Sequence, residues 1–164
     1  MLSIYLGKTK DKTRLLIGSA VVLAAKGKNA LFVSFGSDNE EIYKETFEYF
    51  PNITKLFSPV ALDSDVEMTQ ARLVQTSKVF RDLFDTAVKM ALTCKYDMLI
   101  LDGIFDTAEK GYLTESEIYD FLSNIPDSLE VICSGKTANE KFIQLAKNAI
   151  NLLDSTEQNL SDSE

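Results

Sequence analysis

A run of glycine, lysine and threonine near the start of the chain could bind phosphate. Segment 7–13 (GKTKDKT) lies between a short apolar run and a long segment rich in Ala and Leu. Phosphate-binding loops surround oxygens with backbone N–H groups at a helix N-terminus, add a lysine charge and place a Ser or Thr hydroxyl on Mg²⁺. Lys12 and Thr13 stand in the lysine and hydroxyl positions. The candidate nucleotide-binding residues are Gly7, Lys8, Thr9, Lys10, Lys12, Thr13 and Arg14.

The loop departs from the usual pattern at Asp11, where a glycine normally precedes the lysine. A Cβ hinders close approach of the backbone to phosphate, and a carboxylate repels a polyanion by about 1 kcal/mol at ~4 Å in water-like screening. The neighbouring cations Lys8, Lys10 and Arg14 offset part of that repulsion. The loop alone is equally consistent with a solvated turn in which Asp11 caps the following helix.

A second candidate residue follows the most apolar run of the sequence. Residues 98–101 (MLIL) predict a parallel strand buried on both faces, and Asp102 comes directly after them. Phosphate-binding α/β proteins place the carboxylate on the Mg²⁺ side at such a strand end, so Thr13 and Asp102 are the candidate metal residues. Open parallel sheets bind ligands at the carboxyl ends of their strands, and we expect loop 7–13 to lie there beside Asp102. The structural alternative for Asp102 is a turn residue before Gly103.

The elements that position these residues alternate along the chain. Short apolar runs predict strands at 2–6, 30–35, 98–101 and 129–133, a short or edge strand within 53–62, and a last short strand at 149–153. Helical spacing predicts helices at 12–26, 38–50, 64–93 in one or two parts, 114–122 with a Thr114–Glu117 capping box, and 137–147 with Thr137 as N-cap. We therefore predict an α/β fold, a three-layer P-loop (RecA-like) domain with a mainly parallel sheet between helices.

Composition limits the classes of function. The net charge is −8, and half of it comes from four acids in segment 154–164, which we expect to be a disordered acidic tail after a domain at 1–153. An acidic chain disfavours broad nucleic-acid or membrane binding. The absence of His excludes an imidazole base, and Cys94 and Cys133 are interpreted as buried thiols. No run has the length of a signal or membrane segment, so a cytoplasmic location is expected.

The order of short motifs resembles the P-loop class of ATP:corrinoid adenosyltransferases, whose signature runs close to TGNGKGKTT, VQF, LDE, a YLP-like turn and TGR. This chain has LGKTKDKTR at 6–14, VSF at 33–35, LDG at 101–103, GYL at 111–113 and SGK at 134–136, in the same order. The resemblance implies transfer of the 5′-deoxyadenosyl group of ATP to a Co(I) corrinoid, with Mg-ATP and the corrinoid as ligands. It implies small-molecule partners, with a homodimer left open. Carried over by position, Gly7, Lys10, Lys12 and Thr13 match the loop and Asp102 matches the metal-side acid.

The departures from the family pattern define an alternative function. Thr9 and Asp11 replace glycines, Gly103 replaces a Glu, Arg14 a Thr and Lys136 an Arg. The family also has an aromatic, Trp-containing segment over the corrinoid, whereas this chain has no Trp and the stretch from about Phe57 to Gln70 offers only Phe57 as a stacking ring. The alternative is a non-catalytic relative that binds a nucleotide or a partner. An ordinary P-loop NTPase is the weakest interpretation, because Gly103 cannot orient a water.

Overall fold

Six parallel strands form one sheet, in the order β3-β2-β4-β5-β1-β6. The computed structural model describes residues 1–8, 11–36, 40–62, 67–93 and 95–153, and the predicted acidic tail lies outside these ranges. The strands are β1 (Leu2–Leu6), β2 (Ala30–Ser34), β3 (Ile53–Phe57), β4 (Met98–Asp102), β5 (Glu130–Gly135) and β6 (Asn148–Asn151). β5 lies between β1, which leads into the candidate phosphate loop, and β4, which ends in Asp102. The α/β fold with a parallel sheet is confirmed.

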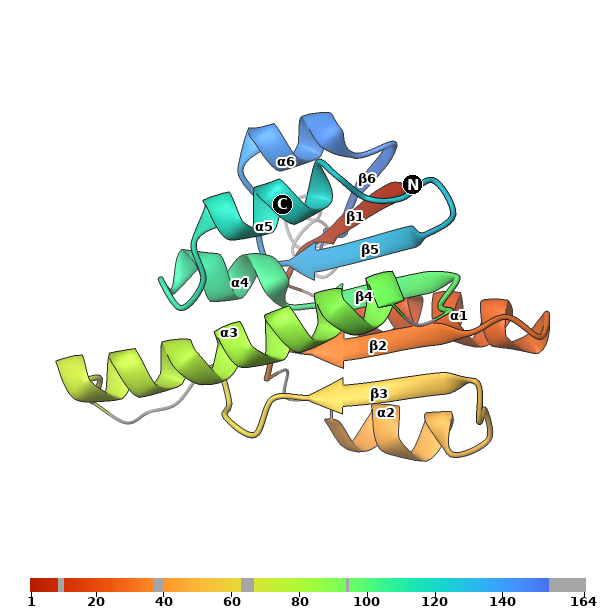
Figure 1. The fold of residues 1–164 in the computed structure, drawn as a ribbon, viewed down its shortest axis with the longest axis horizontal. Coiled ribbons are helices and arrows are strands. Elements are labelled where there is room, and N and C mark those ends of the chain that lie inside the picture. The colour runs from red at the N-terminus through yellow and green to blue at the C-terminus, as the bar shows by residue number, and fades with distance from the viewer. Residues whose placement is uncertain (9–10, 37–39, 63–66, 94, 154–164) are drawn as a thin grey trace, which may run out of the picture.

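Helices cover both faces of the sheet (Figure 1). They are α1 (Asp11–Ala25), α2 (Glu40–Phe47), α3 (Gln70–Thr93), α4 (Ile104–Glu109), α5 (Glu115–Leu122) and α6 (Glu140–Leu145). α1 and α2 pack against Phe32, Ile100 and Ile132 on one face of the sheet. α3 to α6 pack against the other face, which carries the adjacent strand residues, such as Leu31 and Leu101. Successive strand side chains point to opposite faces, so an all-apolar strand supplies both layers.

The two edge strands of the sheet confirm predictions, whereas the predicted limits of one helix are corrected. The predicted edge strand within 53–62 is β3, at one margin of the sheet, and the last short strand is β6 at the other. The predicted cap at Thr137 is wrong: Asn139 is the N-cap, and its side chain accepts a hydrogen bond from the Lys141 N–H. α6 also ends at Leu145 instead of 147, because Ala146 is already extended and Lys147 donates its N–H to the Leu2 carbonyl as the chain enters β6.

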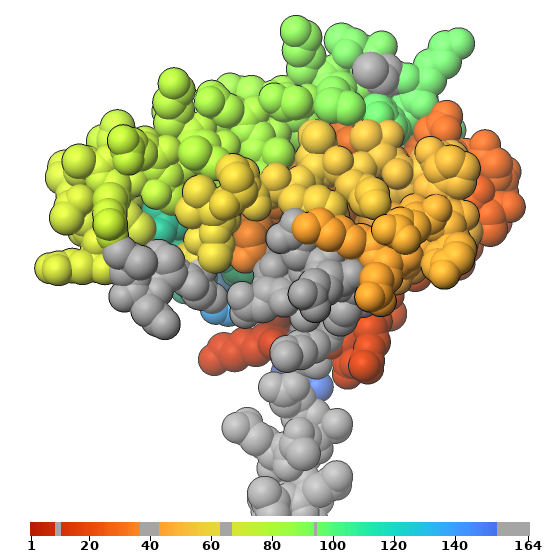
Figure 2. Space-filling model, turned by 90° about the horizontal axis from the view of Figure 1, so that it is seen from below, coloured from red at the N-terminus to blue at the C-terminus, as the bar shows by residue number. Residues whose placement is uncertain are grey.

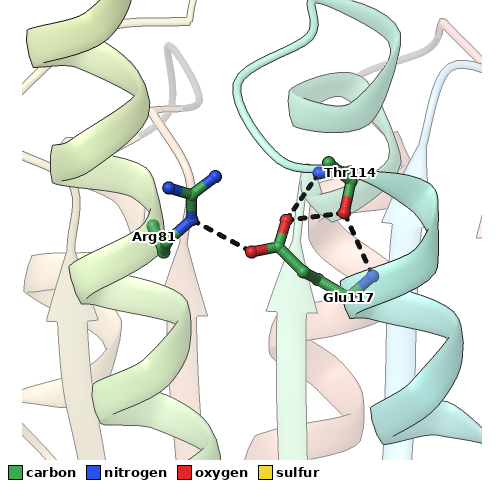
Figure 3. A network of polar contacts seen from close by, with 3 residues as sticks. All are labelled: Arg81, Thr114 and Glu117. Atoms are coloured by element: carbon green, nitrogen blue, oxygen red, sulfur yellow. Dashed lines mark hydrogen bonds and ion pairs between the residues drawn. The ribbon is translucent and has the colours of Figure 1, made fainter.

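The predicted capping box of α5 is present (Figure 3). The Thr114 hydroxyl accepts the Glu117 N–H at 3.2 Å, and the Glu117 carboxylate accepts the Thr114 N–H at 2.9 Å. The other oxygen of Glu117 accepts a hydrogen bond from Arg81 of α3 at 3.0 Å. The Thr114 hydroxyl also donates to the Glu117 carboxylate at 2.7 Å, and this bond, the Thr114 N–H and the Arg81 cation lower the pKa of the Glu117 carboxyl. The box therefore fixes the start of α5 and links it to α3.

The long helix α3 is a single helix of 24 residues that extends beyond the carboxyl ends of the strands (Figure 1). Its buried residues lie between Phe80 and Ala91, whereas Val74, nearer its start, is exposed. Figure 2 shows the β3 margin, with α2 and α3 on either side of that strand. None of the helices in the described part of the chain combines the length and the hydropathy needed to span a bilayer.

Candidate nucleotide-binding site

Gly7 begins the turn between β1 and α1 and lies against the end of β6. Its φ is +130°, a conformation that L side chains rarely adopt, and an added Cβ would lie 2.4 Å from the Leu152 carbonyl oxygen. Its N–H is 3.2 Å from the carbonyl oxygens of both Gly135 and Lys136. Only glycine fits this position, so the turn is fixed by strands on both sides of β1. The candidates Thr9 and Lys10 lie outside the described residues.

Lys12 and Thr13 stand in the first turn of α1, which begins at Asp11. The Lys12 ammonium donates to the Gly7 carbonyl at 2.9 Å, across the turn. Burial lowers the pKa of Lys12, the nearby Lys136 lowers it further, and the carboxylates of Asp106 and Asp102 oppose this shift. The lysine is therefore a partly dehydrated cation at a helix N-terminus, where anions are favoured.

Asp102 is buried at the end of β4 and is surrounded by hydroxyl groups. One of its oxygens accepts the Ser134 hydroxyl at 2.6 Å, and the other accepts the Tyr43 hydroxyl. The Tyr43 oxygen is also 3.5 Å from Oγ1 of Thr13, which is buried. We call these four residues the hydroxyl cluster. Asp102 and Thr13 thus lie on either side of the Tyr43 hydroxyl. Thr13, the last residue of the predicted loop, therefore lies beside the carboxyl end of β4, as expected.

A second group of side chains, Lys12, Asp106 and Lys136, brings two cations and a second carboxylate to the site, and we call it the charged cluster. Asp106 lies on α4, one turn beyond Asp102, and accepts the Lys136 backbone N–H at 2.7 Å. Burial raises the pKa of the Asp106 carboxyl, although the Lys136 N–H and the charges of Lys12 and Lys136 oppose the shift. Sequence reasoning missed Asp106; its only signal is the spacing of four residues from Asp102.

Gly103 explains why no second acid directly follows Asp102. Its φ is +82°, in the left-handed region, and this residue turns the chain from β4 into α4. Its N–H donates to the Ser134 hydroxyl at 3.0 Å, so Ser134 links β5 to both Asp102 and the turn. A side chain here would be strained, and the nearest following carboxylate that faces the site is Asp106.

Asp11 and Arg14 form an exposed ion pair on α1, with Nη1 of Arg14 2.9 Å from Oδ1 of Asp11. Arg14 also lines a shallow groove of about 470 Å³ along the outer side of α1, together with Leu15 and Val22. The structure therefore brings Gly7, Lys12, Thr13 and Asp102 together and places Arg14 on the outer side of α1. Lys8 is exposed beside Gly7.

The family model for the ATP:corrinoid adenosyltransferases BtuR/CobO/CobP matches residues 1–155. The chain belongs to this family. The resemblance drawn from the order of motifs is thereby confirmed, and the ligands of the family are ATP and a corrinoid. No curated protein matches the chain.

A matching solved structure is the crystal structure of domain III from the Thermotoga maritima replication initiation protein DnaA, at 19% identity. The match covers 93% of this chain and 54% of that chain, with a TM-score of 0.38. This chain therefore spans about half of that structure. At this TM-score the likeness carries no inference about function.

Phe57, the one ring predicted for stacking on a corrinoid, is partly buried at the end of β3, with its centroid 6.1 Å from that of Tyr43. The Lys44 ammonium lies 6.0 Å from the same ring. Phe57 is therefore held by the protein core on at least one side. Residues 63–66 of the same stretch lie outside the described residues.

Proposed function

We propose that the chain transfers the 5′-deoxyadenosyl group of ATP to a Co(I) corrinoid. The observation that carries this proposal is the convergence of Lys12, Thr13 and Asp102 at one end of the sheet, in a chain whose family acts on these two substrates. In the transfer, the electron pair of Co(I) forms a Co–C bond to C5′. The C5′–O bond breaks, and its electron pair leaves with triphosphate.

Stabilising the departing triphosphate is the main task left to the protein. In this proposal the N-terminus of α1 and the Lys12 ammonium receive its charge, because preorganised donors in a partly dehydrated site stabilise developing charge most strongly. Lys12 exchanges the Gly7 carbonyl for a phosphate oxygen when ATP binds. Lys8 and Lys136 are the further cations at this end of the sheet, and Lys10 belongs to the same proposal by its position in the sequence.

The donor set on the other side of the loop suits Mg²⁺, which prefers hydroxyl, carboxylate and phosphate oxygens. Thr13 and Asp102 are the residues that would hold it, and the ion would neutralise charge on the triphosphate. In the described part of the chain, no three acidic, cysteine or histidine side chains form a metal cluster. The ion would therefore depend on the oxygens of the nucleotide and on water for its remaining ligands.

Binding and turnover measurements test the proposal. Calorimetry should show weak binding of Mg-ATP by the wild-type protein, because Asp11 places a carboxylate beside the loop. Asp11→Gly should bind up to about tenfold more tightly, equivalent to ~1.4 kcal/mol. Arg14→Gln is the matched variant: it removes the cation that pairs with Asp11 and should weaken binding. Tight wild-type binding that neither change affects would show that Asp11 points away from the phosphates.

Turnover separates the enzyme from the non-catalytic alternative. The protein is mixed with ATP, Mg²⁺ and a chemically reduced corrinoid, and the visible spectrum of the corrinoid reports formation of the Co–C bond. We expect adenosylcorrinoid to accumulate with release of triphosphate. Binding of both substrates without any product would overturn the proposed transfer and leave a binding protein.

A further inference from the structure

The Tyr43 hydroxyl lies between the two groups assigned to the metal. It donates to Asp102 and is 3.5 Å from Oγ1 of Thr13. Tyr43 comes from α2, a helix that contributes no motif residue to the family signature quoted above. A hydroxyl in this place contacts the oxygens of Thr13 and Asp102 on which a hydrated Mg²⁺ would depend.

The Tyr43 ring is firmly packed, so the position of its hydroxyl is well defined. The side chain is fully buried. Its centroid lies 4.6 Å from that of Phe32 and 6.2 Å from that of Phe47, on the face of the sheet covered by α1 and α2. Close-packed aromatic side chains do not move without disturbing their neighbours. The hydroxyl is thus held at Asp102 by its ring as well as by its hydrogen bond, and it can leave Asp102 only if the ring shifts against Phe32 and Phe47.

We propose that the Tyr43 hydroxyl takes the place of Mg²⁺ between Thr13 and Asp102 in the unliganded protein, and that Mg-ATP binds only after displacing it. This inference rests on the proposed function. Tyr43 is a positioning residue that acts through Asp102: it satisfies a buried carboxylate that would otherwise be unpaired on that side, and it competes with the metal. ATP without Mg²⁺ does not compete with the Tyr43 hydroxyl, because its binding requires neither the Thr13 oxygen nor the Asp102 carboxylate.

The test is the effect of Mg²⁺ on ATP affinity, measured by calorimetry in magnesium buffer and in EDTA. The ratio of the two dissociation constants gives the magnesium gain. Tyr43→Phe keeps the ring and removes the competing hydroxyl, so its magnesium gain should exceed that of the wild type by about tenfold, equivalent to ~1.4 kcal/mol. Tyr96→Phe is the matched control, because its hydroxyl also bonds to a threonine, Thr54, at 2.9 Å, next to the opposite ends of the strands. Its gain should equal that of the wild type.

Ser134→Ala tests whether the loss of any hydroxyl bonded to Asp102, and not of the Tyr43 hydroxyl in particular, strengthens Mg²⁺ binding. It also removes a hydroxyl from this carboxylate, but on the oxygen away from Tyr43. A tenfold rise in Tyr43→Phe alone supports the inference. An equal rise in Ser134→Ala, or an unchanged or reduced magnesium gain in Tyr43→Phe, overturns it. Failure of every variant to bind ATP in either buffer would instead refute the proposed function, and the inference with it.

A spectroscopic measurement on the wild type does not depend on how the variant folds. The chain has six Tyr and no Trp, so its near-ultraviolet difference spectrum reports on tyrosine hydroxyls. At saturating ATP, adding Mg²⁺ should shift the tyrosine absorption as Tyr43 releases Asp102, and this shift should persist in Tyr96→Phe. An unchanged spectrum on adding Mg²⁺ would show that the hydroxyl stays in place.

Discussion

The hydroxyl cluster and the charged cluster lie at the same end of the sheet and use opposite means to hold a carboxylate. Asp102 in the hydroxyl cluster is buried and bonded to the neutral donors of Tyr43 and Ser134. Asp106 in the charged cluster is half-buried, bonded to one backbone N–H and faced by the lysines. Neutral hydroxyl donors satisfy a buried carboxylate without burying a further charge. Charges at a partly open site are screened by solvent, and their interactions change when a ligand binds. We infer that the hydroxyl cluster sets geometry and the charged cluster sets affinity for anions.

The largest effect that this comparison predicts is on ATP binding by Lys12→Met. Losing a charge-assisted contact to phosphate should weaken binding about 100-fold, equivalent to ~2.7 kcal/mol, as measured by calorimetry. Lys26→Met, at the other end of α1, is the control and should leave the affinity unchanged. Equal losses in both variants would mean that the overall charge of the chain, and not the cluster, attracts the nucleotide.

Ser134→Ala tests the structural role assigned to the hydroxyl cluster. It leaves one Asp102 oxygen and the Gly103 N–H without their buried partner, so the free energy of unfolding should fall by about 2 kcal/mol in urea denaturation. Ser123→Ala removes an exposed hydroxyl bonded to the Tyr119 carbonyl and should change it by less than ~0.5 kcal/mol. If the two variants lose equal stability, the hydroxyl cluster contributes no more to the free energy of unfolding than an exposed hydroxyl does.

A smaller effect with the opposite sign is expected for Asp106→Asn. Because burial raises the pKa of Asp106 above its unfolded value, this carboxyl stabilises the fold when protonated, and that contribution is lost as pH rises through the raised pKa. The variant keeps an acceptor for the Lys136 N–H, so at pH 7 its free energy of unfolding should exceed that of the wild type by about 0.5 kcal/mol, after allowance for solvent screening. The difference should vanish at a pH below both pKa values. A gain that is largest in acid would contradict this assignment.

The smallest effect is expected at Arg81, a charge outside both clusters. Its ion pair with Glu117 is exposed, with 3.0 Å between the bonded atoms, and exposed pairs contribute little. Arg81→Met should lower the free energy of unfolding by about 0.3 kcal/mol in low salt and by less in high salt. A loss as large as that of Ser134→Ala would remove the distinction between buried and exposed polar contacts.

The buried strands could be predicted from the sequence because each is a short, largely apolar run with few competing interpretations. Lys12, Thr13 and Asp102 could be proposed from the sequence because a phosphate loop and a strand end have recognisable neighbours. Asp106 was not found, because α4 has only six residues and shows no periodicity. Tyr43 lies within the helix predicted at 38–50, but its hydrogen bond to Asp102 joins positions 59 residues apart, which no local pattern reveals.

The cap of α6 shows a similar limit on prediction. Thr137 and Asn139 both have side chains that can cap a helix, and only the position of the chain after β5 decides between them. Gly135 lies close to Phe105 and Asp106, where an added Cβ would be 2.7 Å and 3.2 Å from their nearest side-chain atoms. Such crowding is a tertiary constraint and is absent from local sequence.

The contact between Gly7 and Leu152 determines when the phosphate turn can form during folding. β1 has two neighbours in the sheet, β5 and β6, and both come from the last third of the described chain. The N-terminal amine bonds to the Leu129 carbonyl, 128 residues away, and Leu152 donates its N–H to Leu6. Closing loops of this length is slow compared with forming local helices. We therefore expect β1 to be among the last strands paired, with the phosphate turn completed only when β5 and β6 have joined the sheet.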